Sequence, residues 1–463
     1  MHTAIPEKVT ELALACREMG GRAMLVGGCV RDAILGVEPV EYDIEVYGIE
    51  PVKLRELLDR FGPVDAVGEA FTVYKLGHGI DVTLPRRERK TGVGHRGFVI
   101  EGDPAMSFED ASRRRDFTVN AMLKDPLSDE LIDPFNGEAD LKLNILRAVS
   151  ETTFPEDSLR VLRAAQFVSR YGFEIEASTA DLCRSIPLDD LPKERIWGEI
   201  EKLLIRGEKP FLGMKALYDL KITDKLFPEL QALVGVPQEY DWHPEGNVDV
   251  HTMLVVHEAR KLIDDLPYPK KVAVMLGAVC HDLGKPPTTE FRDGRIRSLA
   301  HDEAGVPPTE EFLDRLGVHT IGGYDVRSQV IALVRYHLKP GEFFKSKPGD
   351  GAFRRLARKV EADLLYRVAK ADSLGRNAEW VPREKWFGSE AQEWFIGRVR
   401  DLEVENSAPR PLLMGRHLIE MGLSPSPQFK KIIEQVYELQ LDGKISDIDS
   451  AVEEARKMIT RGE

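Results

Sequence analysis

The sequence lacks the features that mark secreted and membrane proteins. Its 463 residues contain four cysteines, Cys16, Cys29, Cys183 and Cys280, which are scattered and form no CxxC pair. Such cysteines are typical of reduced, buried residues in a cytoplasmic protein. No apolar run approaches the roughly 20 residues of a membrane-spanning helix. Because Met1–Glu7 has neither a basic region nor an apolar core, we expect no signal peptide and a cytoplasmic protein without a membrane partner.

An excess of positive charge is also absent. The chain has 64 lysines and arginines against 78 aspartates and glutamates, a net charge of −14. This balance argues against a protein that coats nucleic acid nonspecifically. Two local basic runs, at 85–98 and 113–115, can still contact phosphates. An RNA substrate therefore stays open.

The length and the residue pattern indicate several domains. At about 100–200 residues per domain, 463 residues exceed a single one, and 42% hydrophobic with 31% charged residues is typical of a globular protein. Up to about residue 150 the pattern mixes strands and helices, and beyond it the pattern is mostly helical. We expect strands at 23–26, 42–47, 72–76 and 80–84, and helices at 6–19, 31–35 and 51–60.

Two short motifs near the N-terminus indicate phosphate and metal chemistry. Asp43 and Glu45 stand two residues apart in a predicted strand, so both carboxylates project from one face. Such a pair suits Mg²⁺, which prefers few carboxylates together with substrate phosphates. Gly27 and Gly28 lack the Cβ atoms that would hold a triphosphate away from backbone N–H groups.

Five motifs then follow one another along the chain. They are GGCVRD (27–32), DIE (43–45), RRRDFTVNAM (113–122), DPFNGEADL (133–141) and EDSLRVLRAAQF (156–167). In this order and spacing the chain resembles the bacterial (class II) tRNA nucleotidyltransferases. These enzymes add CCA to the 3′ end of tRNA and share their head with bacterial poly(A) polymerases. The resemblance is strongest over residues 20–205, and the remainder is similar to the HD-containing members.

The resemblance implies a two-metal nucleotidyl transfer with Mg²⁺ held by Asp43 and Glu45. Asp81 matches the third acidic position of the class. For Arg31, a phosphate contact and a pairing with Asp32 are both consistent with the sequence. The residues expected around the nucleotide are Gly27, Gly28, Arg114, Arg115, Asp116 and Asn120. Asp116 could equally cap a helix N-terminus.

Base choice without a template is predicted from the segment 156–163. On an expected helix beginning at Phe154, Asp157, Arg160 and Arg163 follow i, i+3, i+6 spacing. A carboxylate and an arginine fit the Watson–Crick edges of cytosine and adenine. Uracil and guanine would leave buried groups unpaired at roughly 1–3 kcal/mol each. The resemblance assigns base recognition to Glu156, Asp157 and Arg160, whereas composition alone favours a surface ion pair.

The segment 86–98 aligns with the flexible loop that the family needs to change from C to A addition. It keeps Arg86 and Glu88 of the family pattern and has Lys90 where many members carry an aromatic residue. This loop argues against an enzyme restricted to adding CC. It does not separate full CCA addition from A addition alone.

A second set of metal-ligand residues occupies 248–376. It resembles the H…HD…D set of HD phosphohydrolases and consists of His251, His281, Asp282 and Asp372, with His301 and His337 available for a second metal. Imidazole and carboxylate ligands together suit a transition metal or Mg²⁺. In related enzymes this domain has phosphatase and 2′,3′-cyclic phosphodiesterase activities. The resemblance therefore implies a metal-dependent phosphohydrolase.

The combined prediction is an α+β multidomain protein, with a polymerase-β-like nucleotidyltransferase head (a mixed sheet with helices) and an all-α remainder. The expected domains are a head (1–150), a helical neck (151–205), a body (206–247), the HD domain (248–376) and a helical, tRNA-contacting tail (377–463). The leading function is CCA addition to tRNA from CTP and ATP. The alternatives are an A-adding enzyme, a poly(A) polymerase, or an HD phosphohydrolase with an RNA-binding head. The sequence indicates no oligomeric state.

Overall fold

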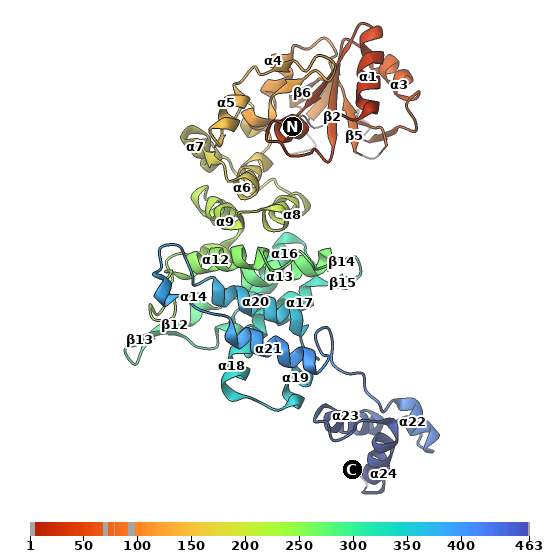
Figure 1. Ribbon diagram of the computed structural model, residues 1–463, viewed down its shortest axis with the longest axis vertical. Helices are drawn as coiled ribbons and strands as arrows, with labels where there is room; N and C mark the ends of the chain where they lie inside the picture. Colours follow the sequence, from red (N-terminus) through yellow and green to blue (C-terminus); the bar gives the residue numbers. More distant parts are fainter. Residues whose placement is uncertain (1–4, 68–72, 78, 91–97, 462–463) are drawn as a thin grey trace. The chain divides into compact units, whose positions relative to one another are not determined.

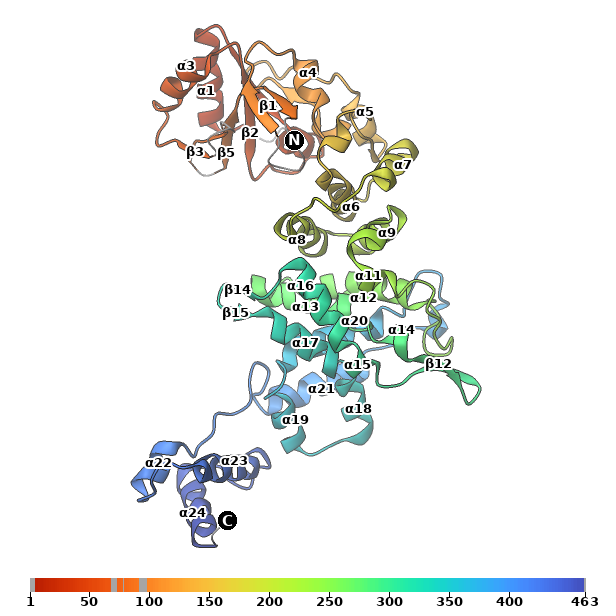
Figure 2. The same ribbon diagram turned by 180° about the vertical axis from the view of Figure 1, so that it is seen from behind.

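The computed structural model describes residues 5–67, 73–77, 79–90 and 98–461. The chain divides into two compact units (Figures 1 and 2). The first comprises Met1–Leu203 with Leu212–Leu226, and the second Leu204–Phe211 with Phe227–Glu463. Within the described ranges, no helix is long and apolar enough to cross a membrane.

The first unit is built on a seven-stranded sheet. Its strands are β1 (Arg22–Val26), β2 (Tyr42–Tyr47), β3 (Asp65–Val67), β4 (Val73–Lys75), β5 (Ile80–Thr83), β8 (Leu123–Lys124) and β9 (Leu131–Ile132). Their order is β3-β4-β5-β2-β1-β8-β9, and only the β2–β5 pair within this sheet is parallel. The predicted mixed sheet is confirmed.

Helices and small strands surround this sheet, and Figures 1 and 2 show α1 and α3 side by side against it. They are α1 (Glu7–Glu18), α2 (Gly28–Ile34), α3 (Pro51–Leu58), the β6–β7 hairpin (Arg86–Lys90 and Phe98–Gly102), α4 (Phe108–Arg113), a 3₁₀ turn (Thr118–Asn120), α5 (Gly137–Lys142), β10 (Ile145–Leu146) and β11 (Glu174–Ile175). The early strands and helices predicted from the sequence all form, with ends that differ by at most three residues.

Strand β2 places the motif D-I-E at the centre of the sheet. Ile44 and Val46 are buried, so the intervening carboxylates of Asp43 and Glu45 point to the opposite face, as the alternation predicts. In the register, Asp43 lies beside Val26 of β1 on one side and beside Asp81 of β5 on the other. The strand therefore delivers its carboxylates next to the turn that begins at Gly27.

The predicted neck contains α6 (Leu159–Tyr171), α7 (Ala177–Ser185) and α8 (Lys193–Glu201), and the predicted body begins with α9 (Pro210–Asp219) and α10 (Ile222–Leu226). The prediction that a helix begins at Phe154 is wrong. Residues 154–156 form a 3₁₀ turn, and Asp157 is extended, with φ −129° and ψ 101°. Its carboxylate accepts a hydrogen bond from the N–H of Leu159, the first residue of α6. Asp157 thereby provides a partner for one of the N–H groups that have no acceptor within the helix. Glu156 and Asp157 thus precede the helix that carries Arg160 and Arg163.

The second unit is mostly helical. Its elements are α11 (Pro228–Gln231), α12 (Val248–Arg260), α13 (Tyr268–Cys280), α14 (Lys285–Thr288), β12 (Thr289–Arg292), β13 (Arg295–Ser298), α15 (His301–Ala304), α16 (Val306–Leu316), β14 (Thr320–Ile321), β15 (Tyr324–Asp325), α17 (Val326–Tyr336), α18 (Lys339–Ser346), α19 (Asp350–Leu356), α20 (Ala362–Leu374) and α21 (Glu390–Asp401). Helix α13 is apolar and buried along Val272–Cys280, and it packs against α12, α17 and α20 (Figures 1 and 2).

The tail of this unit contains α22 (Gly415–Glu420), α23 (Pro427–Leu441) and α24 (Ile448–Arg461), as expected of a helical segment. These helices share an apolar cluster that includes Leu418, Ile432 and Ala455. Arg355 of α19 donates hydrogen bonds to Glu438 (2.6 Å) and Asp442 (2.5 Å), which ties α23 to the helices before it.

Candidate active sites

A cavity of about 550 Å³ in the first unit collects most of the residues predicted for the nucleotide site. Strand β2, the segment 111–116 and the neck helices α6 and α8 form its walls. The predicted residues that line it are Asp43, Glu45, Arg86, Arg114, Arg115, Asp116, Glu156, Asp157, Arg160 and Arg163. The fold thus joins motifs that are more than one hundred residues apart in the sequence.

The acidic side of this cavity carries Asp43 and Glu45. One Glu45 oxygen accepts a hydrogen bond from the Tyr47 hydroxyl (2.5 Å), and the other lies 3.9 Å from Nη2 of Arg115. Desolvation raises the pKa of Asp43, although its side chain reaches solvent. The charge of Arg115 lowers this pKa, whereas the charges of Asp81 and Glu45 raise it further. Carboxylates that repel one another in this way are stabilised by a bound cation.

The turn before α2 brings the backbone close to these charges. Gly27 caps α2 with φ +70° and ψ −130°, a conformation that only glycine adopts without strain. A Cβ atom at this position would lie 2.9 Å from Nη1 of Arg115. At Gly28 the nearest atom to such a Cβ would be Nη2 of Arg31 at 3.5 Å, an ordinary contact.

Arg31 lies apart from the cavity lining. Its guanidinium is buried and donates hydrogen bonds to Asp32 (2.7 Å), to Asn120 (2.5 Å) and to the hydroxyl of Tyr171 (2.7 Å). These contacts favour the pairing alternative for Arg31 over a phosphate contact. Asn120 is likewise buried and connects this network to Asp116.

Asp116 links the head to the neck. Burial raises the pKa of its carboxyl, but the charge of Arg163 and the hydrogen bond from Asn120 outweigh burial and lower it. Its two oxygens accept hydrogen bonds from Nε of Arg163 (2.7 Å) and from Asn120 (2.9 Å). Phe117, not Asp116, occupies the N-cap position of the following 3₁₀ turn, and Asp116 instead holds an arginine at the cavity wall.

Each of the three residues predicted for base choice contacts a residue that lies outside the segment 156–160. Asp157 accepts a hydrogen bond from Arg195 of α8 (2.9 Å). Arg160 donates to the carbonyls of Thr153 (2.7 Å) and Arg114 (2.6 Å), and Glu156 lies 3.6 Å from the guanidinium of Arg114. Burial raises the pKa of Asp157, but the bond from Arg195 outweighs burial and lowers it. An ionised, fixed acceptor therefore lines the cavity.

The flexible-loop prediction can be followed in part. Arg86 lines the cavity and Glu88 lies in strand β6. The loop tip at 91–97 lies outside the described residues.

A second, buried site lies among the helices of the second unit. Six side chains from five segments contribute to it: His251 of α12, His281 and Asp282 after α13, His301 at the start of α15, His337 after α17, and Asp372 of α20. Gly284 permits this arrangement, because a Cβ there would lie 2.0 Å from the carbonyl oxygen of His301. The described residues include two groups of possible metal ligands here, His251–His281–Asp372 and Asp282–His301–His337.

Asp282 belongs to one of these groups and also contacts a histidine of the other. Its Oδ2 lies 3.2 Å from Nε2 of His281, and its Oδ1 lies 3.4 Å from Nε2 of His301. Nε2 of His301 lies in turn 3.2 Å from Nε2 of His337. Asp372 approaches His251 with Oδ1 and Nε2 separated by 3.2 Å.

Asp282 and His337 of this cluster have protonation states that suit a divalent metal. Burial raises the pKa of Asp282, but His281 and Lys285 outweigh burial and hold it well below its usual range. Burial and the neighbouring His301 lower the pKa of His337 to about 4. Ionised carboxylates and neutral imidazoles are the forms that bind metals. Nε2 of His281 is buried and has no hydrogen-bond partner within the described part of the chain, so these residues fit an ion.

Family models match three parts of the chain. Residues 23–147 match the poly A polymerase head domain, 172–233 the probable RNA and SrmB-binding site of polymerase A, and 248–377 the HD domain. The multifunctional CCA protein of Xylella fastidiosa (strain 9a5c) is 38% identical over 373 residues, which span 77% of this chain and 84% of that protein. The chain belongs to the multifunctional CCA protein family.

Two solved structures share the fold of this family member. The Bacillus stearothermophilus CCA-adding enzyme in complex with CTP matches with a TM-score of 0.63 at 19% identity, covering 99% of each chain. The Thermotoga maritima CCA-adding enzyme complexed with tRNA matches with a TM-score of 0.60 at 20% identity, covering 98% of this chain and 97% of that one. The resemblance inferred from the motifs is confirmed, and both matches support the predicted fold.

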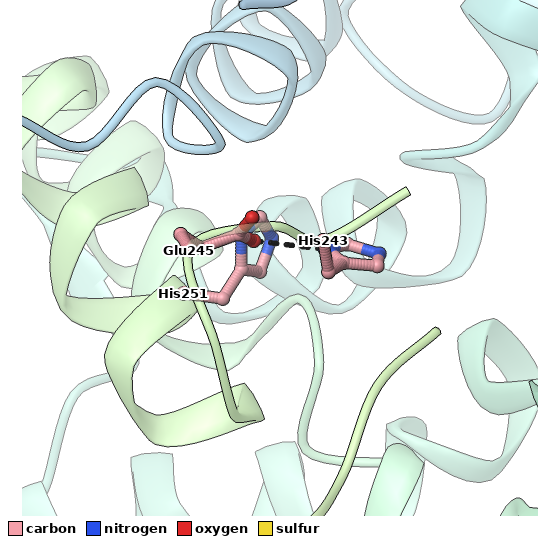
Figure 3. Close-up of side chains that lie close together, drawn as sticks. All are labelled: His243, Glu245 and His251. Atoms are coloured by element: carbon pink, nitrogen blue, oxygen red, sulfur yellow. Dashed lines mark hydrogen bonds and ion pairs between the residues drawn. The ribbon is translucent and has the colours of Figure 1, made fainter. Parts of the chain in front are cut away.

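Four residues of this CCA family member escaped sequence reasoning. Tyr47 follows Glu45 by two positions, so strand alternation could have placed it on the same face. Arg195 reaches Asp157 from another helix, and no spacing signals that contact. His243 and Glu245 lie in an irregular segment before α12 and form a third possible ligand group with His251 (Figure 3).

The two glycines of the family motif give a matched test. Gly27→Ala is expected to lower kcat/KM for CTP at least about tenfold, because backbone strain of about 1–3 kcal/mol adds to displacement of Arg115. Gly28→Ala should lower kcat/KM less than Gly27→Ala does, since its Cβ meets only an ordinary contact with the protein. Incorporation of labelled CTP into tRNA measures both. Equal losses in the two variants would contradict this assignment of the turn.

Proposed function

We propose that this protein adds the 3′-terminal CCA to tRNA from CTP and ATP. The single observation that carries the proposal is the 550 Å³ cavity. Its lining contains both the carboxylates of Asp43 and Glu45 and a cluster of arginines. Its walls also carry the ionised acceptor Asp157. Family membership adds support, since the solved relatives include complexes with CTP and with tRNA. Metal, triphosphate and base each have complementary groups in one cavity.

In the head, Asp43 and Glu45, with Asp81 on the next strand, would hold Mg²⁺. The bound ions supply activation of the RNA 3′-hydroxyl and neutralisation of triphosphate charge. Tyr47 fixes one oxygen of Glu45, which leaves the other available to the cavity. Arg114 and Arg115 bind phosphate oxygens by charge-assisted hydrogen bonds, and the turn at Gly27 admits the triphosphate close to the backbone.

Base choice rests on Asp157 and Arg160 in this proposal. The carboxylate accepts from the exocyclic amine of cytosine or adenine, and the guanidinium donates to a ring nitrogen. Arg195 fixes the acceptor, and the carbonyls of Thr153 and Arg114 orient the donor. Neither uracil nor guanine offers this pattern, so neither base can hydrogen-bond with both groups at once.

Asp157→Ala is expected to relax the choice of nucleotide. Loss of the acceptor removes roughly 1–3 kcal/mol of discrimination, so the preference for CTP over UTP should fall by about 5- to 150-fold. The ratio of kcat/KM values for the two nucleotides measures it. Asp189→Ala, an exposed aspartate on the same unit, is the matched control. Unchanged discrimination against UTP in Asp157→Ala would rule out the base-reading role.

A product ladder tests the function itself. Purified protein is incubated with CTP, ATP and Mg²⁺ on three tRNAs that end before the first C, after one C and after CC. Extension of each to a complete CCA end is expected. Addition of a single A only to the tRNA ending in CC would identify an A-adding enzyme. Long A tracts on unrelated RNA would identify a poly(A) polymerase.

We also propose a second function, metal-dependent hydrolysis of phosphate esters at the HD site. A cavity of about 290 Å³ opens onto His301 and is lined by Lys285, Lys345 and Arg376. Nζ of Lys285 lies 2.7 Å from Oδ2 of Asp282. Cations beside a metal-ligand cluster suit a phosphate group that is attacked by water. The mixed imidazole and carboxylate set favours a transition metal.

We propose that the protein acts in the cytoplasm and that its chain is divided into five domains. The four cysteines are free and buried, which is consistent with a reducing cytoplasm. We assign the head to 1–150, the neck to 151–205, the body to 206–247, the HD domain to 248–376 and the tRNA-contacting tail to 377–463. The family-model match at 23–147 supports the extent of the head, and the match at 248–377 supports that of the HD domain.

A further inference from the structure

The histidines of the HD site are oriented through their outer ring nitrogens. Nδ1 of His281 lies 2.8 Å from the carbonyl oxygen of Ala278, and Nδ1 of His301 lies 2.8 Å from that of Ser298. Nδ1 of His337 lies 2.6 Å from the carbonyl oxygen of Val334. In all three, the carbonyl belongs to the residue three positions earlier. A carbonyl only accepts, so Nδ1 carries the proton and Nε2 is left as the metal-facing ligand atom.

His251 has a different outer partner. Its Nδ1 lies 2.7 Å from Oε1 of Glu245, while its Nε2 faces Asp372 at 3.2 Å and Asp282 at 3.7 Å. The contact with Glu245 has the distance of an ion pair, and the atoms are not aligned as a regular hydrogen bond. The Glu245 side chain is fully buried. One histidine of the four therefore meets a charged group where the others meet a neutral carbonyl.

Glu245 is itself held in place from two sides. Nδ1 of His243 lies 2.9 Å from the same Oε1, and the dashed line in Figure 3 marks this interaction. Nε1 of Trp380 donates a hydrogen bond to the backbone carbonyl of Glu245 (3.1 Å). His243 also lines the 290 Å³ cavity together with Lys285 and Arg376. His243 thus reaches the cavity, and Glu245 contacts both His243 and His251.

We propose that Glu245 is the outer carboxylate that orients His251 toward the HD metal, and that His243 fixes Glu245 in this role. The inference rests on the proposed HD metal centre. A carboxylate behind a ligating imidazole sets the ring orientation and raises its basicity more than a carbonyl does, because it is charged. Glu245 and His243 are positioning residues, and His251 is the ligand through which they act.

His243, Glu245 and His251 could instead bind an ion among themselves, but the geometry favours the other side of His251. A neutral imidazole offers one lone pair, so its Nδ1 and Nε2 cannot both bind metals. Nε2 of His251 faces the same cluster as Nε2 of His281, which has no hydrogen-bond partner among the described residues. On the Nδ1 side, Glu245 is already contacted by both histidines.

The test is Co²⁺ binding to the full-length protein, followed by visible absorption and by calorimetry. Glu245→Gln, which keeps the shape but removes the charge, is expected to weaken Co²⁺ binding by about 10- to 100-fold. Nucleotide incorporation by the head should stay unchanged. Glu239→Gln is the matched control, because Glu239 lines the same cavity and contacts the N–H of Ile296. It should bind Co²⁺ as the wild-type protein does.

The outcomes separate the inference from the proposed function. No Co²⁺ binding by the wild-type protein would overturn the HD metal centre and the inference with it. Wild-type affinity in Glu245→Gln would overturn the inference alone. Abolished binding in His243→Asn with retained binding in His281→Asn would place the ion at the Nδ1 side and also overturn it. If Glu245→Gln does not fold, Glu245→Asp serves, since it keeps the charge but withdraws the carboxylate and should still weaken binding.

Discussion

Asp43→Asn is expected to abolish nucleotide incorporation while leaving metal binding at the HD site intact. The amide keeps the shape of the carboxylate but is a neutral and much weaker ligand for Mg²⁺. Substitution of a residue that only supports a ligand typically costs 10- to 100-fold, so loss of the ligand itself should exceed about 100-fold in kcat/KM. Incorporation of labelled CTP into tRNA that lacks its CCA end measures the loss.

Glu41→Gln is the control for this prediction. Glu41 is exposed at the edge of β2, and its charge contributes to the field at Asp43 without facing the cavity lining. If Asp43 acts as a ligand, Glu41→Gln should retain nearly full incorporation. A comparable loss in both variants would mean that Asp43 acts only through the general negative potential, and it would contradict the ligand assignment.

Local periodicity explains which parts of the head could be predicted. In β2, alternation alone places Ile44 and Val46 in the core and the two carboxylates of the motif on the other face. The parallel neighbour β5 then brings Asp81, which the resemblance gave as the third acidic position, beside Asp43. Elements of this kind depend on residues within a few positions of one another, so a sequence specifies them well.

Contacts between distant segments explain the errors. A local pattern could not decide whether Arg31 contacts phosphate, and in the fold it bonds to Asn120, 89 positions away. The helix expected from Phe154 is delayed to Leu159, because Asp157 adopts an extended conformation in which Arg195 holds its carboxylate. The role of Glu245 can be recognised only once the fold has placed His251 and Trp380 around it. Site residues that act by holding other residues leave no spacing signature.

Asp282→Asn is expected to have the opposite effect from Asp43→Asn. Asp282 is the one carboxylate that approaches both ligand groups in the described cluster, with its oxygens 3.2 Å from His281 and 3.4 Å from His301. An asparagine there removes the shared anion and directs an amide at imidazole nitrogens. Metal-dependent hydrolysis of a phosphate ester should fall more than about 100-fold. Addition of CCA should be unchanged, because the two sites lie in different units.

The buried lysine beside Asp282 sharpens this last test. Lys285 is 6% exposed and lies 2.7 Å from Asp282, so Asp282→Asn leaves a buried cation without its anion. Breaking such a pair costs about 3–5 kcal/mol, and the second unit should unfold at a lower temperature.

Asp302→Asn is the control, since it carries the same charge change next to His301 but outside the described cluster. Restored stability in Asp282→Asn/Lys285→Met would show that the lowered unfolding temperature of Asp282→Asn comes from the unpaired buried lysine. Loss of CCA addition in Asp282→Asn would contradict the independence of the two sites.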